Sequence, residues 1–158
     1  MAQITIYTDG AAKGNPGRGG YGIVMISGNH YKELSQGFRN TTNNRMELLS
    51  VIVALETIKF AKSDVFIYSD SKYVVDAVDK KWVFDWQKKG FKGKKNIDLW
   101  QRFLRIYPKH NLKFFWVKGH AGNTHNERCD VLAVQAAESN NLLVDAAYES
   151  EQSSGSLL

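Results

Sequence analysis

Hydrophobic and polar positions along the chain repeat with two different periods, and these periods predict the secondary structure. Residues 3–8 alternate between apolar and polar and are rich in β-branched side chains, which is typical of a strand. Residues 21–26 and 30–39 predict two further strands, and the glycine-rich stretch 9–20 predicts a loop before them. Residues 45–62 are apolar on nearly every side, which predicts a helix buried against a sheet.

The second half of the chain alternates between strand and helix patterns. The predicted strands are 65–69 and 112–117, and the predicted helices are 71–81, 97–106 and about 126–138. This order predicts an α/β fold in which a mixed sheet carries helices on its faces. We expect one domain over residues 1–138. From residue 139 onward the charges are only acidic, and we expect a weakly ordered C-terminal tail over 139–158.

Length and composition narrow the class of protein. The 158 residues suffice for one sizeable core, and 43% hydrophobic with 23% charged residues excludes a disordered chain. No apolar run approaches the roughly 18–20 residues that span a bilayer, and the first residues show no secretory leader. The single cysteine, Cys129, cannot form an internal disulfide and is expected to be buried. We therefore expect a cytoplasmic protein.

The net charge of +5 comes from one segment, residues 80–95, which we call the basic segment. It reads KKWVFDWQKKGFKGKK and holds seven lysines and one acid, so the rest of the chain is close to neutral. Trp82, Trp86 and Phe91 lie among the lysines, and flat aromatic faces beside ammonium groups favour nucleic-acid binding. A basic helix on a membrane surface is the alternative, but glycines at 90 and 93 interrupt its short apolar face.

Four carboxylates are the candidate chemistry. Residues 4–9 and 65–70 are alike, since each is an apolar strand that ends in Tyr, a hydroxyl residue and Asp. If a parallel crossover sets these strands side by side, Asp9 and Asp70 lie together at the carboxyl edge of the sheet. Either Asp alone could be an ordinary cap or turn residue. With Glu47 and Asp130 added, such a group would repel itself unless divalent cations neutralise it, as in two-metal phosphoryl chemistry.

The histidines differ in their surroundings. His120 lies in a polar, glycine-bearing loop, where an imidazole beside a metal site suits proton transfer or product release. His30 and His110 are expected at the surface. His120, His125 and Cys129 fit none of the usual zinc-ligand spacings, so we do not expect a zinc site.

In residues 3–138 the chain resembles bacterial type 1 ribonuclease H (ribonuclease HI). The matching motifs, in order, are YTDGAAKGNPG, TTNNRMEL, YSDSKYV, the basic segment, KNIDLW and WVKGHAGNTHNERCDVLA. The resemblance implies a ribonuclease H-like fold, a five-stranded mixed sheet of order 3-2-1-4-5 in which strands 1–3 are antiparallel. It also implies a monomeric endonuclease that hydrolyses the RNA strand of RNA–DNA hybrids, leaving 5′-phosphate and 3′-hydroxyl ends, and that removes RNA primers and R-loops.

The resemblance also assigns roles to individual residues. Asp9, Glu47, Asp70 and Asp130 would bind two Mg²⁺ ions, for which Mn²⁺ would substitute, with Asp9 bridging both, and His120 would assist proton transfer or product release. The RNA strand would lie along Gly10, Ala12, Asn15, Asn43 and Asn44. The DNA strand would lie along Trp82, Trp86, Lys88, Lys89 and Phe91, with Thr42 and Asn96 holding a DNA phosphate.

The chain departs from the family pattern at Ala12, Asn40, Lys72 and Phe91, where the family often has Cys, Arg, Gln or Asn, and Trp. None of the four is one of the candidate metal-binding carboxylates.

Two alternatives stay open at this point. A non-catalytic nucleic-acid module on the same fold would be expected to lack a carboxylate, and all four are present. A related nuclease, such as a Holliday-junction resolvase, an integrase or an exonuclease, would not be expected to carry GHAGNTHNERCD together with the basic segment.

Overall fold

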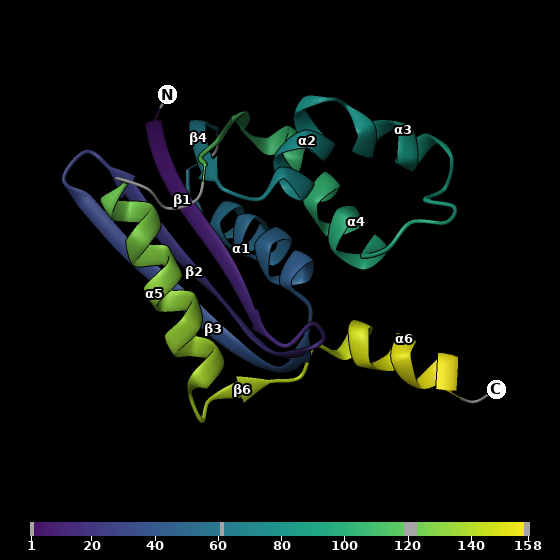
Figure 1. The fold of residues 1–158 in the computed structure, drawn as a ribbon. Helices are drawn as coiled ribbons and strands as arrows, with labels where there is room; N and C mark the ends of the chain where they lie inside the picture. The colour runs from purple at the N-terminus through teal and green to yellow at the C-terminus, as the bar shows by residue number, and fades with distance from the viewer. Residues whose placement is uncertain (1, 61, 119–122, 157–158) are drawn as a thin grey trace.

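A twisted sheet forms the centre of the molecule and helices cover both of its faces (Figure 1). The computed structural model describes residues 2–60, 62–118 and 123–156. The strands are β1 (Ala2–Lys13), β2 (Gly17–Ser27), β3 (His30–Thr41), β4 (Ser63–Ser69), β5 (Asn111–Trp116) and β6 (Leu142–Leu143). The helices are α1 (Asn43–Thr57), α2 (Lys72–Asp79), α3 (Trp82–Lys88), α4 (Ile97–Ile106), the 3-10 turn Tyr107–Lys109, α5 (Thr124–Glu138) and α6 (Ala146–Ser156).

The strand order is β5-β4-β1-β2-β3-β6. β1, β2 and β3 form an antiparallel meander, whereas β4 pairs parallel to β1 and β5 parallel to β4. The predicted ribonuclease H-like sheet is therefore confirmed, with one short strand added at the edge. In the β1–β4 register Tyr7 lies opposite Tyr68, so Asp9 and Asp70, each two residues later, lie at the same level.

Helices α1 to α4 cover one face of the sheet, and α5 covers the other. α1 is buried over most of its length against β1 and β2, as its all-round apolar sequence predicts, and α2, α3 and α4 extend this layer. α5 packs across β1, β2 and β3 on the opposite face. It can approach closely because β2 carries Gly22, where a Cβ atom would collide with the carbonyl oxygen of Cys129.

The element boundaries differ from the prediction at two places. The glycine-rich stretch is mostly strand, since β1 continues to Lys13 and β2 begins at Gly17, with Lys13 opposite Arg18. α1 ends at Thr57 rather than residue 62, because Ile58 has extended backbone angles. In both places local composition marked the type of structure and long-range pairing decided its extent.

The predicted weak order after residue 138 is wrong for much of that segment. β6 adds to the sheet in parallel with β3, through the pairs Gly37–Leu142 and Phe38–Leu143. Asp145 and Tyr148 are buried, and α6 projects from this anchored end (Figure 1).

His110, expected at the surface, is also buried, and its Nδ1 accepts a hydrogen bond from the Ser63 amide at 3.1 Å. Within the described part of the chain, no helix has the length and apolar character to cross a membrane.

Candidate active site

Three carboxylates from separate elements meet just beyond the point where the parallel pairing of β1 with β4 ends. Asp9 lies in β1, Asp70 directly follows β4, and Glu47 lies near the start of α1. Their oxygens can all lie within 4.8 Å of one another. The parallel pairing of β1 with β4 sets the first two side by side, and the packing of α1 on β1 supplies the third. Sequence analysis predicted all three.

Gly10 allows α1 to approach this edge of the sheet. A Cβ atom at Gly10 would collide with the backbone at Met46 and Glu47. The Gly10 amide donates a hydrogen bond to the Asp9 carboxylate at 2.9 Å and another to the Glu47 carboxylate. One peptide N–H thus holds two acids together, and only a glycine fits at this contact.

The cluster brings three acidic side chains close together in a largely buried place. Asp9 and Glu47 are each only 4% exposed, whereas Asp70 is half-buried. Burial, followed by repulsion from Asp9 and Asp70, raises the pKa of Glu47 well above its usual range. Closely spaced buried carboxylates of this kind fit a hard divalent cation, which prefers oxygen ligands and removes the repulsion.

Asp130 lies on α5 and lines the same cavity of about 430 Å³ as the three clustered acids. Its carboxylate is not part of the tight group of three. Gly10, Asn43 and Asn44, assigned to the RNA strand, also line this cavity. His120 lies outside the described residues.

Lys72 is the basic residue that lines the acidic cavity. Its ammonium lies 4.5 Å from the centre of the Trp116 ring, a cation–π contact. The Trp116 indole in turn donates a hydrogen bond to the Asp70 carbonyl oxygen at 3.1 Å. Trp116 therefore contacts both the backbone of one acid and the cation beside it.

A second cavity, of about 300 Å³, lies beside the first and shares Asn44 with it. Thr42, Asn15 and Asn96 line this polar cavity together with Lys95. Thr42 caps α1, and its hydroxyl accepts a hydrogen bond from the Arg45 amide. The predicted phosphate-binding residues Thr42 and Asn96 are thus brought together.

Asn96 is held in place by its neighbours. It has a left-handed backbone with φ 60° at the start of α4. Its side-chain amide donates to the Tyr73 hydroxyl at 2.9 Å, and that hydroxyl also accepts from the Trp100 indole at 2.9 Å. Tyr73 itself lines the acidic cavity, so one phenol links the two cavities.

Arg45 forms a second buried charge cluster close to the acids. Its guanidinium is 3% exposed and bonds bidentately to both Asp98 and Asp145, with N–O distances of 2.7–2.9 Å. Burial alone would lower the pKa of Arg45, but the bonds to Asp98 and Asp145 outweigh it and raise the pKa. The Thr41 hydroxyl adds a further bond to Asp145 at 2.7 Å.

The basic segment forms α3 and the turns that follow it. Trp82 is 43% exposed, and Lys88 and Lys89 are exposed, so all three are accessible. Trp86 is half-buried, with its ring edge-on to the Trp100 ring at a centroid distance of 5.9 Å. The assignment of Phe91 to the DNA-facing surface is wrong, because its side chain is 5% exposed and belongs to the core.

Cys129 is buried, as predicted. Its thiol donates to the Tyr7 carbonyl at 3.2 Å, and burial raises its pKa to about 12, so it is no nucleophile near neutral pH. His125 packs on the Tyr7 ring at 4.8 Å. Among the described residues, the acids Asp9, Glu47 and Asp70 form the group suited to a metal ion, and neither His125 nor Cys129 belongs to it.

Sequence analysis assigned no role to several residues around the two cavities. Arg45 was missed, although an arginine directly before the apolar run of a buried helix signals a buried ion pair. Lys95 was counted only as part of the basic segment. The lining residues from α6, which are Tyr148, Glu151 and Gln152, were missed because the tail was expected to be weakly ordered. No local pattern identifies them.

Comparison with known proteins gives a consistent result. A model of the RNase H family matches residues 1–138. The ribonuclease H of Desulforamulus reducens is 56% identical over 150 residues, which cover 92% of this chain and 94% of that protein. The ribonuclease H of Rippkaea orientalis is 51% identical over 154 residues, 94% of each protein.

Solved structures show the same likeness. LC9-RNase H1, a type 1 RNase H with the type 2 active-site motif, has a TM-score of 0.78 at 32% identity and covers 95% of this chain and 80% of that one. LC11-RNase H1, solved in complex with an RNA/DNA hybrid, has a TM-score of 0.63 at 28% identity, over 85% of this chain and 96% of that one.

Proposed function

This chain belongs to the RNase H family and is a ribonuclease H, and from that premise we propose that it is an endonuclease for the RNA strand of RNA–DNA hybrids. The observation that carries the proposal is the convergence of Asp9, Glu47 and Asp70 at one sheet edge, beside polar cavities suited to a nucleic-acid backbone. LC11-RNase H1, which shares the fold, binds an RNA/DNA hybrid in its solved complex.

The reaction is hydrolysis of a phosphodiester. A water oxygen attacks phosphorus, the bond to the 3′-oxygen breaks, and the products are a 5′-phosphate and a 3′-hydroxyl. Two Mg²⁺ ions, held by Asp9, Glu47, Asp70 and Asp130, would activate the water and stabilise the leaving oxygen. Gly10 keeps Asp9 and Glu47 in position for this task, and Lys72 offers a positive charge at the rim. His120 would move a proton or help the product leave.

Recognition of the hybrid would use both strands. The amides of Asn15, Asn43 and Asn44 and the backbone near Gly10 and Ala12 are suited to 2′-hydroxyls, the groups by which a protein distinguishes RNA from DNA. Thr42 and Asn96 would hold a phosphate of the DNA strand. The DNA would continue along the basic segment, where Trp82, Lys88 and Lys89 are accessible.

A cleavage assay with four substrates tests the function. The protein is mixed with an end-labelled RNA–DNA hybrid, double-stranded RNA, single-stranded RNA or duplex DNA, with Mg²⁺ or with EDTA. We expect internal cuts in the RNA of the hybrid alone, abolished by EDTA. Binding without cutting would favour the non-catalytic module, and cutting of duplex or branched DNA would favour a different nuclease.

The role of the basic segment has its own test. Lys88→Ala with Lys89→Ala should weaken hybrid binding and reduce the slope of log K against log salt by about two at most, since each phosphate contact contributes about 0.9. Lys109→Ala with Lys113→Ala, on the 3-10 turn and β5 and outside the basic segment, is the matched control. An unchanged slope in the first variant would remove the segment from the interface.

We further propose that the enzyme acts as a cytoplasmic monomer that removes RNA primers and R-loops. A single buried cysteine suits a reducing compartment. Mg²⁺ is proposed as the working ion, with Mn²⁺ as a substitute, because the acids offer only oxygen ligands. Sedimentation of the purified protein and cleavage with each metal alone would test these two points.

A further inference from the structure

The C-terminal helix α6 forms one wall of the cavity that contains Thr42 and Asn96. Tyr148, Glu151 and Gln152 line this cavity from the tail, facing Lys95 and the start of α1. The matching family model ends at residue 138, so this wall comes from a part of the chain that the model does not cover. The tail therefore adds side chains to a cavity whose other walls belong to the catalytic domain.

The wall is firmly attached to the rest of the molecule. Asp145, just before α6, bonds to the buried Arg45 and to Thr41. Tyr148 is 8% exposed, and Glu149 forms a bidentate ion pair with Arg39 of β3 at 2.7 and 2.9 Å. The first turn of α6 is thus fixed to both α1 and β3, which fixes the direction in which the helix leaves the domain.

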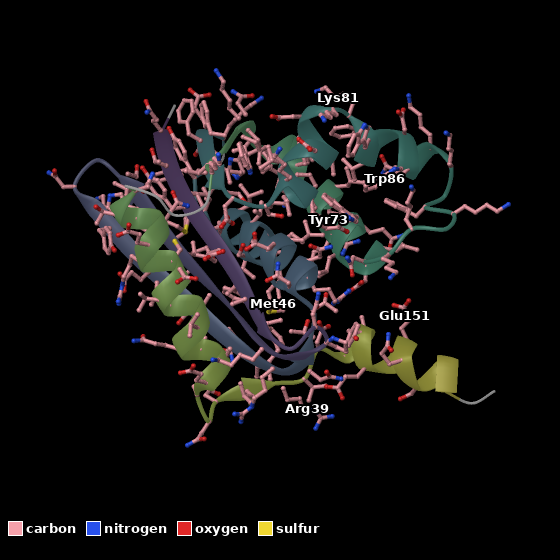
Figure 2. All side chains as sticks on the ribbon, viewed as in Figure 1. Arg39, Met46, Tyr73, Lys81, Trp86 and Glu151 are labelled. Carbon is pink, nitrogen blue, oxygen red and sulfur yellow. The ribbon has the colours of Figure 1, made fainter. Side chains whose placement is uncertain are left out.

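The two glutamates of α6 have different surroundings. Glu149 is neutralised by Arg39, on one side of the helix. Glu151 lies on the opposite side, towards α4 (Figure 2). Among the residues that the structure describes, its carboxylate forms no ion pair or hydrogen bond. A full negative charge therefore lines a cavity whose other charged group is the ammonium of Lys95.

We propose that Glu151 is a residue that tunes affinity for the hybrid, because it weakens the binding of a DNA-strand phosphate in this cavity. The inference rests on the proposed function, in which Thr42 and Asn96 bind that phosphate. A carboxylate beside a phosphate repels it and offsets the attraction of Lys95. The tail then prevents overly tight binding of the DNA strand, which favours release of the nicked hybrid without touching the reacting atoms.

The first test measures hybrid binding and turnover in three variants. Glu151→Gln should lower the Kd in Ca²⁺ buffer by about two- to fivefold at low salt, as expected for one screened charge at the rim of a binding site. Glu151→Lys should lower it further, and the single-turnover rate at saturating enzyme should not change. Asp64→Asn, the same charge change at the far end of β4 from Asp70, is the control and should leave Kd unchanged.

A second test identifies the group that Glu151 repels. Hybrids carry one neutral methylphosphonate at successive positions of the DNA strand, and each is bound by wild type, Thr42→Ala and Glu151→Gln. The phosphate whose neutralisation removes the effect of Thr42→Ala occupies the cavity. The gain from Glu151→Gln should vanish for that same substrate and persist for the others.

The outcomes separate the two proposals. If no methylphosphonate alters the effect of Thr42→Ala, the phosphate site itself is wrong. If Thr42 has its phosphate but Glu151→Gln leaves Kd unchanged or weakens binding, the role of Glu151 is overturned.

Discussion

Two buried charged side chains near the start of α1 have opposite surroundings. Arg45 and Glu47 are two residues apart, and they are only 2% and 4% exposed. Arg45 is surrounded by the carboxylates of Asp98 and Asp145, which compensate it. Glu47 is surrounded by Asp9 and Asp70, which add to its charge.

This difference separates a structural cluster from a functional one. A buried ion that is paired within the protein needs nothing further, and its loss is a loss of stability. Like charges that are brought close together cost stability in the absence of a ligand, so they mark a place suited to cations. The two clusters share one helix turn, yet substitutions in them should have opposite consequences.

The largest effect should come from removing one acid of the carboxylate cluster of Asp9, Glu47 and Asp70. Asp70→Asn is expected to lower the rate of hybrid cleavage in Mg²⁺ by at least about 10²–10³-fold, the scale of losing one preorganised electrostatic group. Its melting temperature in EDTA should not fall, because the substitution removes a like charge from beside Asp9 and Glu47. Asp98→Asn is the matched control, and it should keep its cleavage rate while melting earlier.

The next largest effect should come from breaking the Arg45 cluster. Arg45→Met should lower the free energy of unfolding by about 3–5 kcal/mol, because it leaves the buried Asp145 carboxylate without its cationic partner. Urea denaturation in EDTA measures this. Arg39→Met removes an exposed bidentate pair with Glu149 and should change the midpoint little. Equal losses in the two variants would remove the distinction between buried and exposed pairs.

Glu47→Gln should have the opposite sign, because neutral Gln removes the repulsion from Asp9 and Asp70. In EDTA at pH 8 its melting temperature should rise by a few degrees, since about 1 kcal/mol corresponds to about 2–4 °C at this size. The pKa of Glu47 is higher in the folded than in the unfolded chain, so the folded state holds the extra proton. Stability of the metal-free protein should therefore fall as pH rises above the ordinary Glu range.

That pH slope should be smaller in Glu47→Gln than in wild type, whereas Arg45→Met should keep it. Melting curves between pH 5 and pH 8 in EDTA make this comparison. A lower melting temperature for Glu47→Gln than for wild type at pH 8 would mean that the acid cluster stabilises the fold, contrary to its raised pKa.

The smallest effect should be the pH dependence of stabilisation by metal. Mg²⁺ requires ionised ligands, so binding displaces the proton from Glu47, and the rise in melting temperature that Mg²⁺ produces should grow with pH. The same titration with Asp70→Asn should show a reduced rise at every pH. A metal-induced rise that is equal at pH 5.5 and pH 8 would indicate that Glu47 is already ionised before metal binds.

Much of the fold was predictable because its signals are local. The strand-forming alternation of residues 3–8 and the all-round apolar pattern of α1 predict their elements directly. The repeated strand–Tyr–hydroxyl–Asp pattern also predicts that Asp9 and Asp70 meet, given a parallel crossover, and the β1–β4 register confirms it. The extents of β1, β2 and α1 were less predictable, because pairing with distant residues decides where an element ends.

The misses share a physical cause. Phe91 resembles an exposed aromatic of the basic segment, but the turn after α3 directs it into the core. Asp145 resembles a tail residue, but its partner Arg45 lies 100 positions earlier in the chain. A side chain's exposure depends on what packs against it, and in both cases that neighbour is remote in sequence or set by a turn.

The sequence by itself determined the main order of strands and helices up to residue 138, the position of the basic segment and the four acids that belong to the candidate site. These features depend on periodicity and residue type, which are properties of short stretches. The tertiary structure decided that Arg45 is neutralised while Glu47 is not, and that α6 walls a cavity beside Thr42. Charge compensation and cavity walls depend on which distant groups come within a few ångströms, and only the folded chain fixes those distances.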